Sequence, residues 1–127
     1  MLQKVRALIG RPAAMSPARA REKIAAGMLV VDVRDADEFA HGHIAGAIHI
    51  PLRQIESDGA ETIAPLASVS DRREVILFVC RSGARSEAAC NALRSQLGRR
   101  AQFLEGGLMA WVGAGIPLSR ELTHSYS

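Results

Sequence analysis

The chain has 127 residues, of which 48% are hydrophobic and 23% charged, and its formal net charge is +3 at pH 7. These values fit one globular domain with a packed core and exclude a disordered chain, and two cysteines are too few for a secreted disulfide framework. No apolar run approaches the roughly 18 residues of a membrane helix, and Arg6 and Arg11 interrupt the first apolar segment before a signal-peptide core forms, so we expect a cytoplasmic protein.

The first predicted elements are a helix and a strand. A helix is expected over 17–26, because Ser16 is a good N-cap, Pro17 suits the first helical position and Gly27 suits the end. The run MLVVDV at 28–33 is short, apolar and rich in valine. This pattern is typical of a strand that is buried on both faces of a parallel sheet.

A short helix and a second strand follow. Asp35 and Glu38 have the spacing of a capping box, which predicts a helix through Ala40 that Gly42 ends. The run AIHIP at 47–51 predicts a strand that proline closes.

The middle of the chain contains the clearest strand. Residues 52–67 have helical spacing with a weak point at Asp58 and Gly59, which predicts one broken helix or two short ones. EVILFV at 74–79 has the strongest pattern of a buried strand. After a loop of mostly small residues, the sequence SEAACNALRSQLG at 86–98 predicts a further helix.

The last predicted elements complete an alternating order. Residues 101–107 predict a strand and a glycine turn, residues 108–115 predict a short helix before Pro117, and a tail begins at about residue 119. Strands that alternate with helices need crossover connections, so they pair in parallel. We therefore expect an α/β fold with a parallel sheet and helices on both of its faces.

Cys80 is the first residue after the strand predicted at 74–79. Ligands of open parallel sheets bind at the carboxyl ends of the strands, so this is a site position. The residues at 81–85 are mostly small, which lets backbone N–H groups turn toward one anion at the start of a helix. Helix N-termini and nearby arginines lower a cysteine pKa and make the thiolate a nucleophile. The alternative is that Cys80 only fills space at a strand end.

Other polar residues receive structural interpretations. Cys90 lies in the helix predicted at 86–98, where a small apolar side chain facing the core is sufficient. His41, His43 and His49 are close in sequence, but no cysteine or carboxylate set completes a metal-ligand spacing, so we predict no metal site. Asp32 ends a buried strand and must be paired there, so we expect it to hold loop amides or an arginine.

Three stretches resemble the signature sequences of the rhodanese family, in the order of that family: VDVRDADEFAHGHIAGAIHIP, VILFVCRSGARS and FLEGGLMAWVGAGIPL. The resemblance implies one rhodanese domain over 16–118, with an N-terminal extension at 1–15 and a C-terminal tail at 119–127. It also implies a three-layer α/β sandwich with a five-stranded parallel sheet flanked by helices on both faces. In this family the histidine that matches His43 is structural and fixes the turn after the short helix.

The resemblance implies a sulfurtransferase that works through a persulfide on Cys80. Sulfane sulfur would move from a small anionic donor such as thiosulfate to cyanide or a thiol, including a thiol of a small redox protein. No metal or organic cofactor is required. Arg34 and Arg85 match positions that supply cations to the anionic donor. The loop whose amides hold the transferred sulfur corresponds to Arg81, Ser82, Gly83, Ala84 and Arg85.

Two other functions remain open from the sequence. One is a binding or regulatory module that keeps the rhodanese fold without catalysis. The other is a phosphatase or arsenate reductase of the related fold, but those enzymes have five residues between the cysteine and the arginine, whereas four residues separate Cys80 from Arg85. The basic residues are scattered and lack interleaved aromatics, so we expect no nucleic-acid partner, and we expect no membrane partner.

Overall fold

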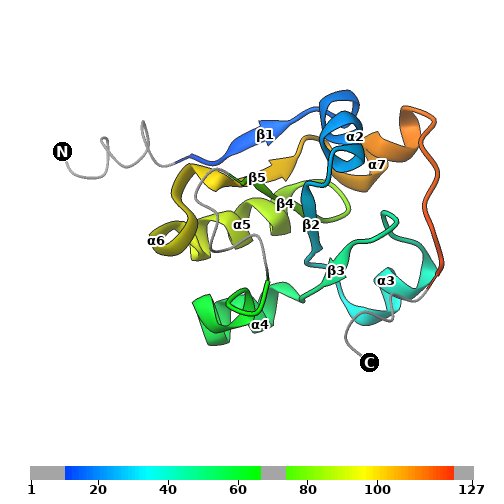
Figure 1. Cartoon of the computed structure of the whole chain (residues 1–127). Helices are drawn as coiled ribbons and strands as arrows, with labels where there is room; N and C mark the ends of the chain where they lie inside the picture. The colour runs from blue at the N-terminus through cyan, green and yellow to red at the C-terminus, as the bar shows by residue number, and fades with distance from the viewer. Residues whose placement is uncertain (1–10, 67–73, 122–127) are drawn as a thin grey trace.

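A five-stranded parallel sheet forms the centre of the protein (Figure 1). The computed structural model describes residues 11–66 and 74–121. The strands lie side by side in the order β1-β5-β4-β2-β3. They are β1 (Ala13–Met15), β2 (Leu29–Asp32), β3 (Ile48–His49), β4 (Ile76–Val79) and β5 (Ala101–Leu104). The predicted parallel α/β fold is confirmed.

The central strand β4 divides the core into two halves. Its side chains alternate between the two faces of the sheet, as the period of two in a strand requires. Ile76 and Phe78 pack into one hydrophobic cluster, and Leu77 and Val79 pack into the other. All four residues are fully buried. The run EVILFV is therefore apolar at successive positions because helices cover both faces of its strand.

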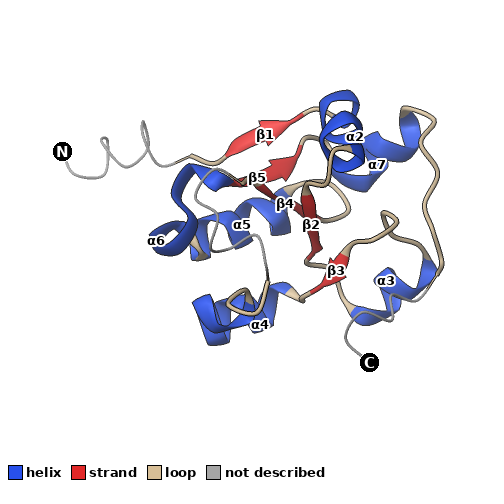
Figure 2. Cartoon of the chain, viewed as in Figure 1, coloured by secondary structure: helices blue, strands red, loops and turns tan. Residues whose placement is uncertain are grey.

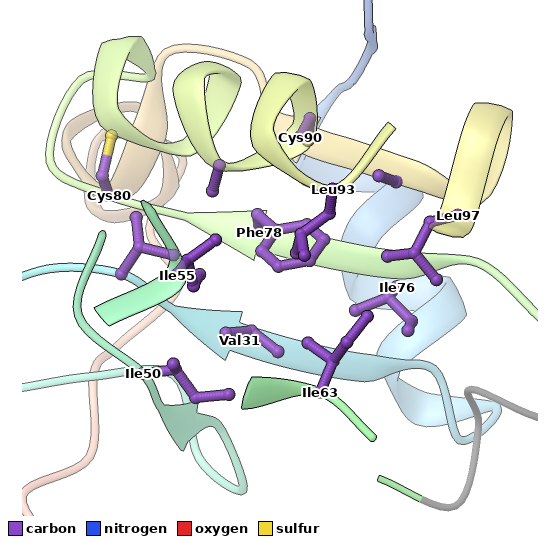
Figure 3. Close-up of a cluster of buried hydrophobic side chains, with 13 residues drawn as sticks. Val31, Ile50, Ile55, Ile63, Ile76, Phe78, Cys80, Cys90, Leu93 and Leu97 are labelled. Carbon is purple, nitrogen blue, oxygen red and sulfur yellow. The ribbon is translucent and has the colours of Figure 1, made fainter. Parts of the chain in front are cut away.

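Helices α4 (Leu52–Asp58), α5 (Ala84–Ala92) and α6 (Arg94–Leu97) pack on the first face, together with the 3₁₀ turn Gly59–Thr62. Figure 3 shows their contribution to the core around Phe78. The side chains that they and their flanking residues bring to this face are Ile55, Ile63, Ala89, Cys90, Leu93 and Leu97.

Helices α2 (Pro17–Ala25), α3 (Ala36–His41) and α7 (Gly107–Gly113) pack on the second face. Their buried residues include Ala20, Phe39, Leu108 and Trp111. Helices thus lie on both sides of the strands (Figure 2). The predicted three-layer architecture is confirmed.

Several local predictions are confirmed at the level of single hydrogen bonds. The hydroxyl of Ser16 accepts the N–H of Arg19 at 3.2 Å and caps α2. The Glu38 carboxylate accepts the N–H of Asp35 at 3.0 Å at the start of α3. The segment after β3 is interrupted between Asp58 and Gly59, as expected, and continues as the 3₁₀ turn.

Other elements differ from the sequence-based prediction. The helix predicted over 86–98 is interrupted at Leu93, where φ is −103° and ψ is 13°, so α5 and α6 are separate. The Leu93 carbonyl accepts the N–H groups of Gln96 and Leu97 at 3.1 and 2.9 Å, which tightens the chain before it turns toward β5. Strand β3 is also shorter than predicted, because it lies at the edge of the sheet and pairs with β2 alone.

No strand was predicted at β1, which pairs with β5 at the other edge of the sheet. Its sequence Ala-Ala-Met is short and lacks the β-branched residues that mark strands. Residues 1–10 of the predicted N-terminal extension lie outside the described residues. Within the described ranges, every helix is too short or too polar to span a lipid bilayer.

The first residues of the predicted C-terminal tail fold back onto the domain. Ser119 pairs with His43 through two backbone hydrogen bonds of 2.7 and 2.8 Å. The carbonyl oxygen of Glu121 lies 2.8 Å from Nε2 of His43. Residues 122–127 lie outside the described residues.

Phe78 is the largest fully buried side chain of the core. We expect Phe78→Ala to lower the free energy of unfolding by about 3–5 kcal/mol, because the substitution removes apolar contacts and leaves a cavity. Urea unfolding followed by circular dichroism measures this loss. Met109→Ala is the control, because Met109 is 58% exposed and its substitution should change stability by less than about 0.5 kcal/mol. Equal losses in both variants would contradict this assignment of the core.

Candidate active site at the carboxyl end of β4

Cys80 directly follows β4, which lies between β5 and β2 in the middle of the sheet. Figure 3 shows its side chain at the end of this strand, next to the first turn of α5, with Cys90 further along the same helix. Only 1% of Cys80 is exposed. A molecule that reacts with this sulfur must therefore be small or must reach it with a narrow end.

The segment after Cys80 curls so that backbone N–H groups point at the sulfur. The N–H of Gly83 lies 3.0 Å from Sγ, and the N–H of Ser86 lies 3.4 Å from it. Gly83 makes the curl possible, because its φ of 119° lies in a region that other residues rarely adopt. Helix α5 begins at the next residue and adds the positive end of its dipole.

The hydroxyl of Ser86 lies between two acceptors and carries one proton. It donates to the Gly83 carbonyl at 2.9 Å and lies 3.4 Å from Sγ of Cys80. A protonated Cys80 can donate to the Ser86 oxygen while this arrangement holds. A thiolate has no proton to donate, so the hydroxyl must then turn toward the sulfur. Ser86 can therefore serve both protonation states of Cys80 without a backbone movement.

Burial is the largest single influence on Cys80 and acts to raise its pKa. The hydroxyl of Ser86 and the N–H groups of Ser86, Gly83 and Ser82 act in the opposite direction, because they stabilise the thiolate. Together they hold the pKa of Cys80 below its ordinary value. The buried sulfur is thus set up as a nucleophile.

Helix α7 binds the backbone carbonyls of the cysteine loop. The N–H of Leu108 donates to the carbonyl of Cys80 at 2.9 Å, and the N–H of Met109 donates to the carbonyl of Arg81 at 3.0 Å. A Cβ atom at Gly107 would lie 2.3 Å from the Arg81 oxygen and 2.6 Å from the Ser82 nitrogen. Only glycine permits this close approach of two backbones.

Arg85 points its guanidinium at a carboxylate from another element. Its Nη1 and Nη2 atoms donate to the two oxygens of Glu38 at 2.7 and 3.0 Å, a bidentate ion pair. The hydrogen bond from Arg85 is the largest of the influences that lower the pKa of Glu38 to about 2. The second cation predicted for the donor is therefore already paired with Glu38, which sequence reasoning treated only as a helix cap.

Arg34 forms a buried ion pair of its own. Its Nε and Nη2 atoms contact the Asp32 carboxylate at 2.8–3.2 Å, and Nη2 also donates to the Gly42 carbonyl at 2.6 Å. Asp32 accepts the backbone N–H of Arg34 as well. The prediction that Asp32 holds a loop amide or an arginine is confirmed. These contacts connect the end of β2 to the turn after α3, and a role for Arg34 in donor binding stays a prediction.

Three of the remaining predicted loop residues lie on the surface and one is buried. Arg81, Ser82 and Ala84 are exposed, whereas Gly83 is buried under the curl. The structure thus brings Cys80 and the predicted loop together. Sequence reasoning missed three residues that shape this site: Glu38, Ser86 and Gly107. The available signals were the acidic partner in the capping box, a serine directly after the loop arginine, and a glycine pair at the start of the last helix.

The second cysteine and the histidines have structural surroundings. Burial raises the pKa of Cys90 to about 12, so this thiol is not a nucleophile at neutral pH. Both ring nitrogens of His43 contact carbonyl oxygens, and its ring stacks on Phe39 at 3.8 Å. The predicted structural role of His43 is confirmed. Among the described residues, no group of three or more histidines, cysteines or carboxylates is arranged to hold a metal ion.

Comparison with known families identifies this arrangement. The family model described as "Rhodanese-like domain" matches residues 16–114. The chain belongs to the rhodanese-like domain family. The match spans α2 through α7 and contains the Cys80 loop.

Relatives of this rhodanese-like domain cover most of its length. The chain is 37% identical over 105 residues to YtwF of Bacillus subtilis, whose name is that of a candidate sulfurtransferase, covering 81% of this chain and 93% of that protein. It is 35% identical over 91 residues to a protein of Allochromatium vinosum named sulfurtransferase, covering 72% and 78%. A crystal structure of a rhodanese-related protein of Thermoplasma volcanium matches with a TM-score of 0.69 and 31% identity, covering 86% and 99%.

Removal of the Ser86 hydroxyl tests the basis of thiolate formation. In a Cys90→Ala background, we expect Ser86→Ala to move the pH midpoint of Cys80 alkylation by iodoacetamide to higher pH. The rate at neutral pH should fall about tenfold, because a hydrogen bond to a charged group contributes about 1.5 kcal/mol. Ser57→Ala, at an exposed position of α4, is the matched control. An unchanged midpoint in Ser86→Ala would show that the hydroxyl does not stabilise the thiolate.

The close approach of α7 to the loop can be tested separately from backbone strain. Gly107 and Gly98 have φ values of +63° and +53°, and a Cβ at Gly98 meets nothing within 4 Å. Alanine is strained at both positions because φ is positive, but only Gly107→Ala displaces the loop. We expect Gly107→Ala alone to lose the alkylation of Cys80 at neutral pH, with urea unfolding as the measure of strain. Equal reactivity in the two variants would contradict the close approach.

Proposed function

We propose that this protein is a sulfurtransferase that carries sulfane sulfur as a persulfide on Cys80. The observation that carries this proposal is the convergence of the Gly83 and Ser86 N–H groups and the Ser86 hydroxyl on one buried sulfur atom. Hydrogen-bond donors that converge on one point can stabilise a negatively charged sulfur. Such a charge is present on the Cys80 thiolate and, after sulfur uptake, on the terminal sulfur of the persulfide. The relatives named as sulfurtransferases support the same chemistry.

In the first half-reaction, the Cys80 thiolate attacks the outer sulfur of an anionic donor such as thiosulfate. The new S–S bond forms on Cys80 while the S–S bond of the donor breaks, and the electron pair of that bond leaves with sulfite. Thiolate and thiosulfate thereby give a persulfide anion and sulfite, and the total charge is unchanged. The hydrogen bonds that lower the pKa of Cys80 increase the share of the thiolate that can act as the nucleophile.

In the second half-reaction, an acceptor nucleophile attacks the terminal sulfur of the persulfide. Cyanide leaves as thiocyanate, or a thiolate leaves as a persulfide, and the S–S bond returns its electron pair to Cys80. A cysteine of a small redox protein is an acceptor of the same kind. The Ser86 hydroxyl again faces a sulfur without a proton. No metal or organic cofactor takes part in either displacement.

The length of the loop supports sulfur over phosphate as the transferred group. Four residues separate Cys80 from Arg85, and the guanidinium of Arg85 is turned to Glu38. A tetrahedral oxyanion needs several hydrogen-bond donors spread around its oxygens, whereas a single sulfur atom needs hydrogen-bond donors that converge on one point. The proposal also includes a reducing compartment, the cytoplasm, because Cys80 and Cys90 are both free thiols.

Intact-mass spectrometry tests the proposal directly. We expect the protein to gain the mass of one sulfur atom after incubation with thiosulfate and to lose it again on addition of cyanide, with thiocyanate released. Cys80→Ser should gain nothing, while Cys90→Ser, the matched control at the other cysteine, should behave as wild type. If Cys80→Ser gains the same mass, or if wild type gains none, the persulfide proposal is wrong, and a binding module becomes the better interpretation.

A further inference from the structure

The arginines around Cys80 differ in whether a carboxylate accompanies them. Arg34 is paired with the fully buried Asp32, and Arg85 is paired with Glu38 through both of its terminal nitrogens. Arg81 is exposed, and among the described residues its side chain has no hydrogen bond or ion pair. Two of the three arginine charges near the loop are thus offset in the resting protein.

Glu38 connects two elements at the site. One of its oxygens accepts both the N–H of Asp35 at the start of α3 and Nη1 of Arg85, and the other accepts Nη2. The side chains of Arg85 and Glu38 are 36% and 32% exposed, so the pair is only partly screened by solvent. Arg85 directly precedes Ser86, whose N–H and hydroxyl both lie 3.4 Å from Sγ of Cys80, so the ion pair lies at the edge of the cysteine loop. A donor anion bound at Cys80 experiences both members of the pair.

We propose that Glu38 is a specificity-determining residue that disfavours doubly charged sulfur donors by offsetting the charge of Arg85. Glu38 acts through Arg85, so it is a positioning residue and takes no part in the sulfur transfer. A singly charged sulfane donor, of the type R–S–S⁻ or R–SO₂–S⁻, then loses less from this pairing than thiosulfate does. This inference rests on the proposed sulfurtransferase function.

The physical basis is the Coulomb interaction of the donor with a nearly neutral ion pair. A lone guanidinium near the sulfur would attract a dianion about twice as strongly as a monoanion. A carboxylate held against that guanidinium removes most of the difference and also repels the second charge. One uncompensated charge at a partly buried position should change the relative preference by about tenfold, or about 1.4 kcal/mol.

Thiosulfate and methanethiosulfonate form a matched pair of donors. They have the same outer sulfur and differ by one oxygen anion that is replaced with a methyl group. Attack of the Cys80 thiolate on methanethiosulfonate forms the same persulfide anion and releases methanesulfinate with the electron pair of the broken S–S bond. The change between wild type and a variant in the ratio of kcat/KM for thiosulfate to kcat/KM for methanethiosulfonate therefore reports the effect of charge, because the intrinsic difference between the two leaving groups cancels. The fraction of active protein cancels in this ratio.

Three variants of the ion pair give results in different directions. We expect Glu38→Gln to raise the thiosulfate-to-methanethiosulfonate ratio about tenfold, because Arg85 then lacks a counter-charge, while glutamine still suits the capping position. Arg85→Gln should lower the ratio, because Glu38 is left beside the sulfur without its partner. The double variant should return the ratio to near the wild-type value. Each change should shrink at high salt.

The control removes the same charge at a distant position. Glu22→Gln, at an exposed position of α2, changes the net charge of the protein by the same amount as Glu38→Gln and should leave the ratio unchanged. An unchanged ratio in both Glu38→Gln and Arg85→Gln would overturn the proposal, and so would an equal change in Glu22→Gln. If neither donor loads sulfur onto Cys80 in the wild type, the proposed function itself fails, and this inference fails with it.

Discussion

The contact between the backbone at Gly107 and the backbone at Arg81 is the constraint on which the site depends. It lets the N–H groups that follow Gly107 bind the carbonyls of Cys80 and Arg81. With these carbonyls fixed from outside, the loop directs its own N–H groups inward to Sγ. The depressed pKa of Cys80 therefore depends on a helix that contributes no side chain to the sulfur.

Two arginines near this electron-rich sulfur form ion pairs with carboxylates. Arginine at a thiolate strengthens anion binding, but a free guanidinium can also close on the thiolate and block the nucleophile. Asp32 and Glu38 hold Arg34 and Arg85 in place through bidentate contacts, so most of the activation of Cys80 comes from backbone N–H groups and one hydroxyl. Such neutral dipoles stabilise a negative sulfur without enclosing it in ion pairs.

Much of the fold was accessible from sequence because the central strands are buried on both faces. EVILFV and the loop after Cys80 were predictable from apolar runs, small residues and a helix start, each a local pattern. Strand β1 was not, because Ala-Ala-Met has no strand pattern and pairs only through the distant β5. Glu38 and Gly107 were missed as site residues because their partners are also distant in the sequence. Glu38 pairs with Arg85, which is 47 residues away, and Gly107 packs against the backbone of Arg81.

The order of the strands has a consequence for synthesis of the chain. Cys80 leaves the ribosome before β5 and α7, yet β5 lies between β1 and β4, and α7 carries the groups that fix the cysteine loop. Until the last part of the domain is translated, β1 has no strand to pair with, and the N–H groups of α7 that fix the Cys80 loop are not in place. Activation of the sulfur is thus coupled to completion of folding, which keeps a reactive thiolate out of the nascent chain.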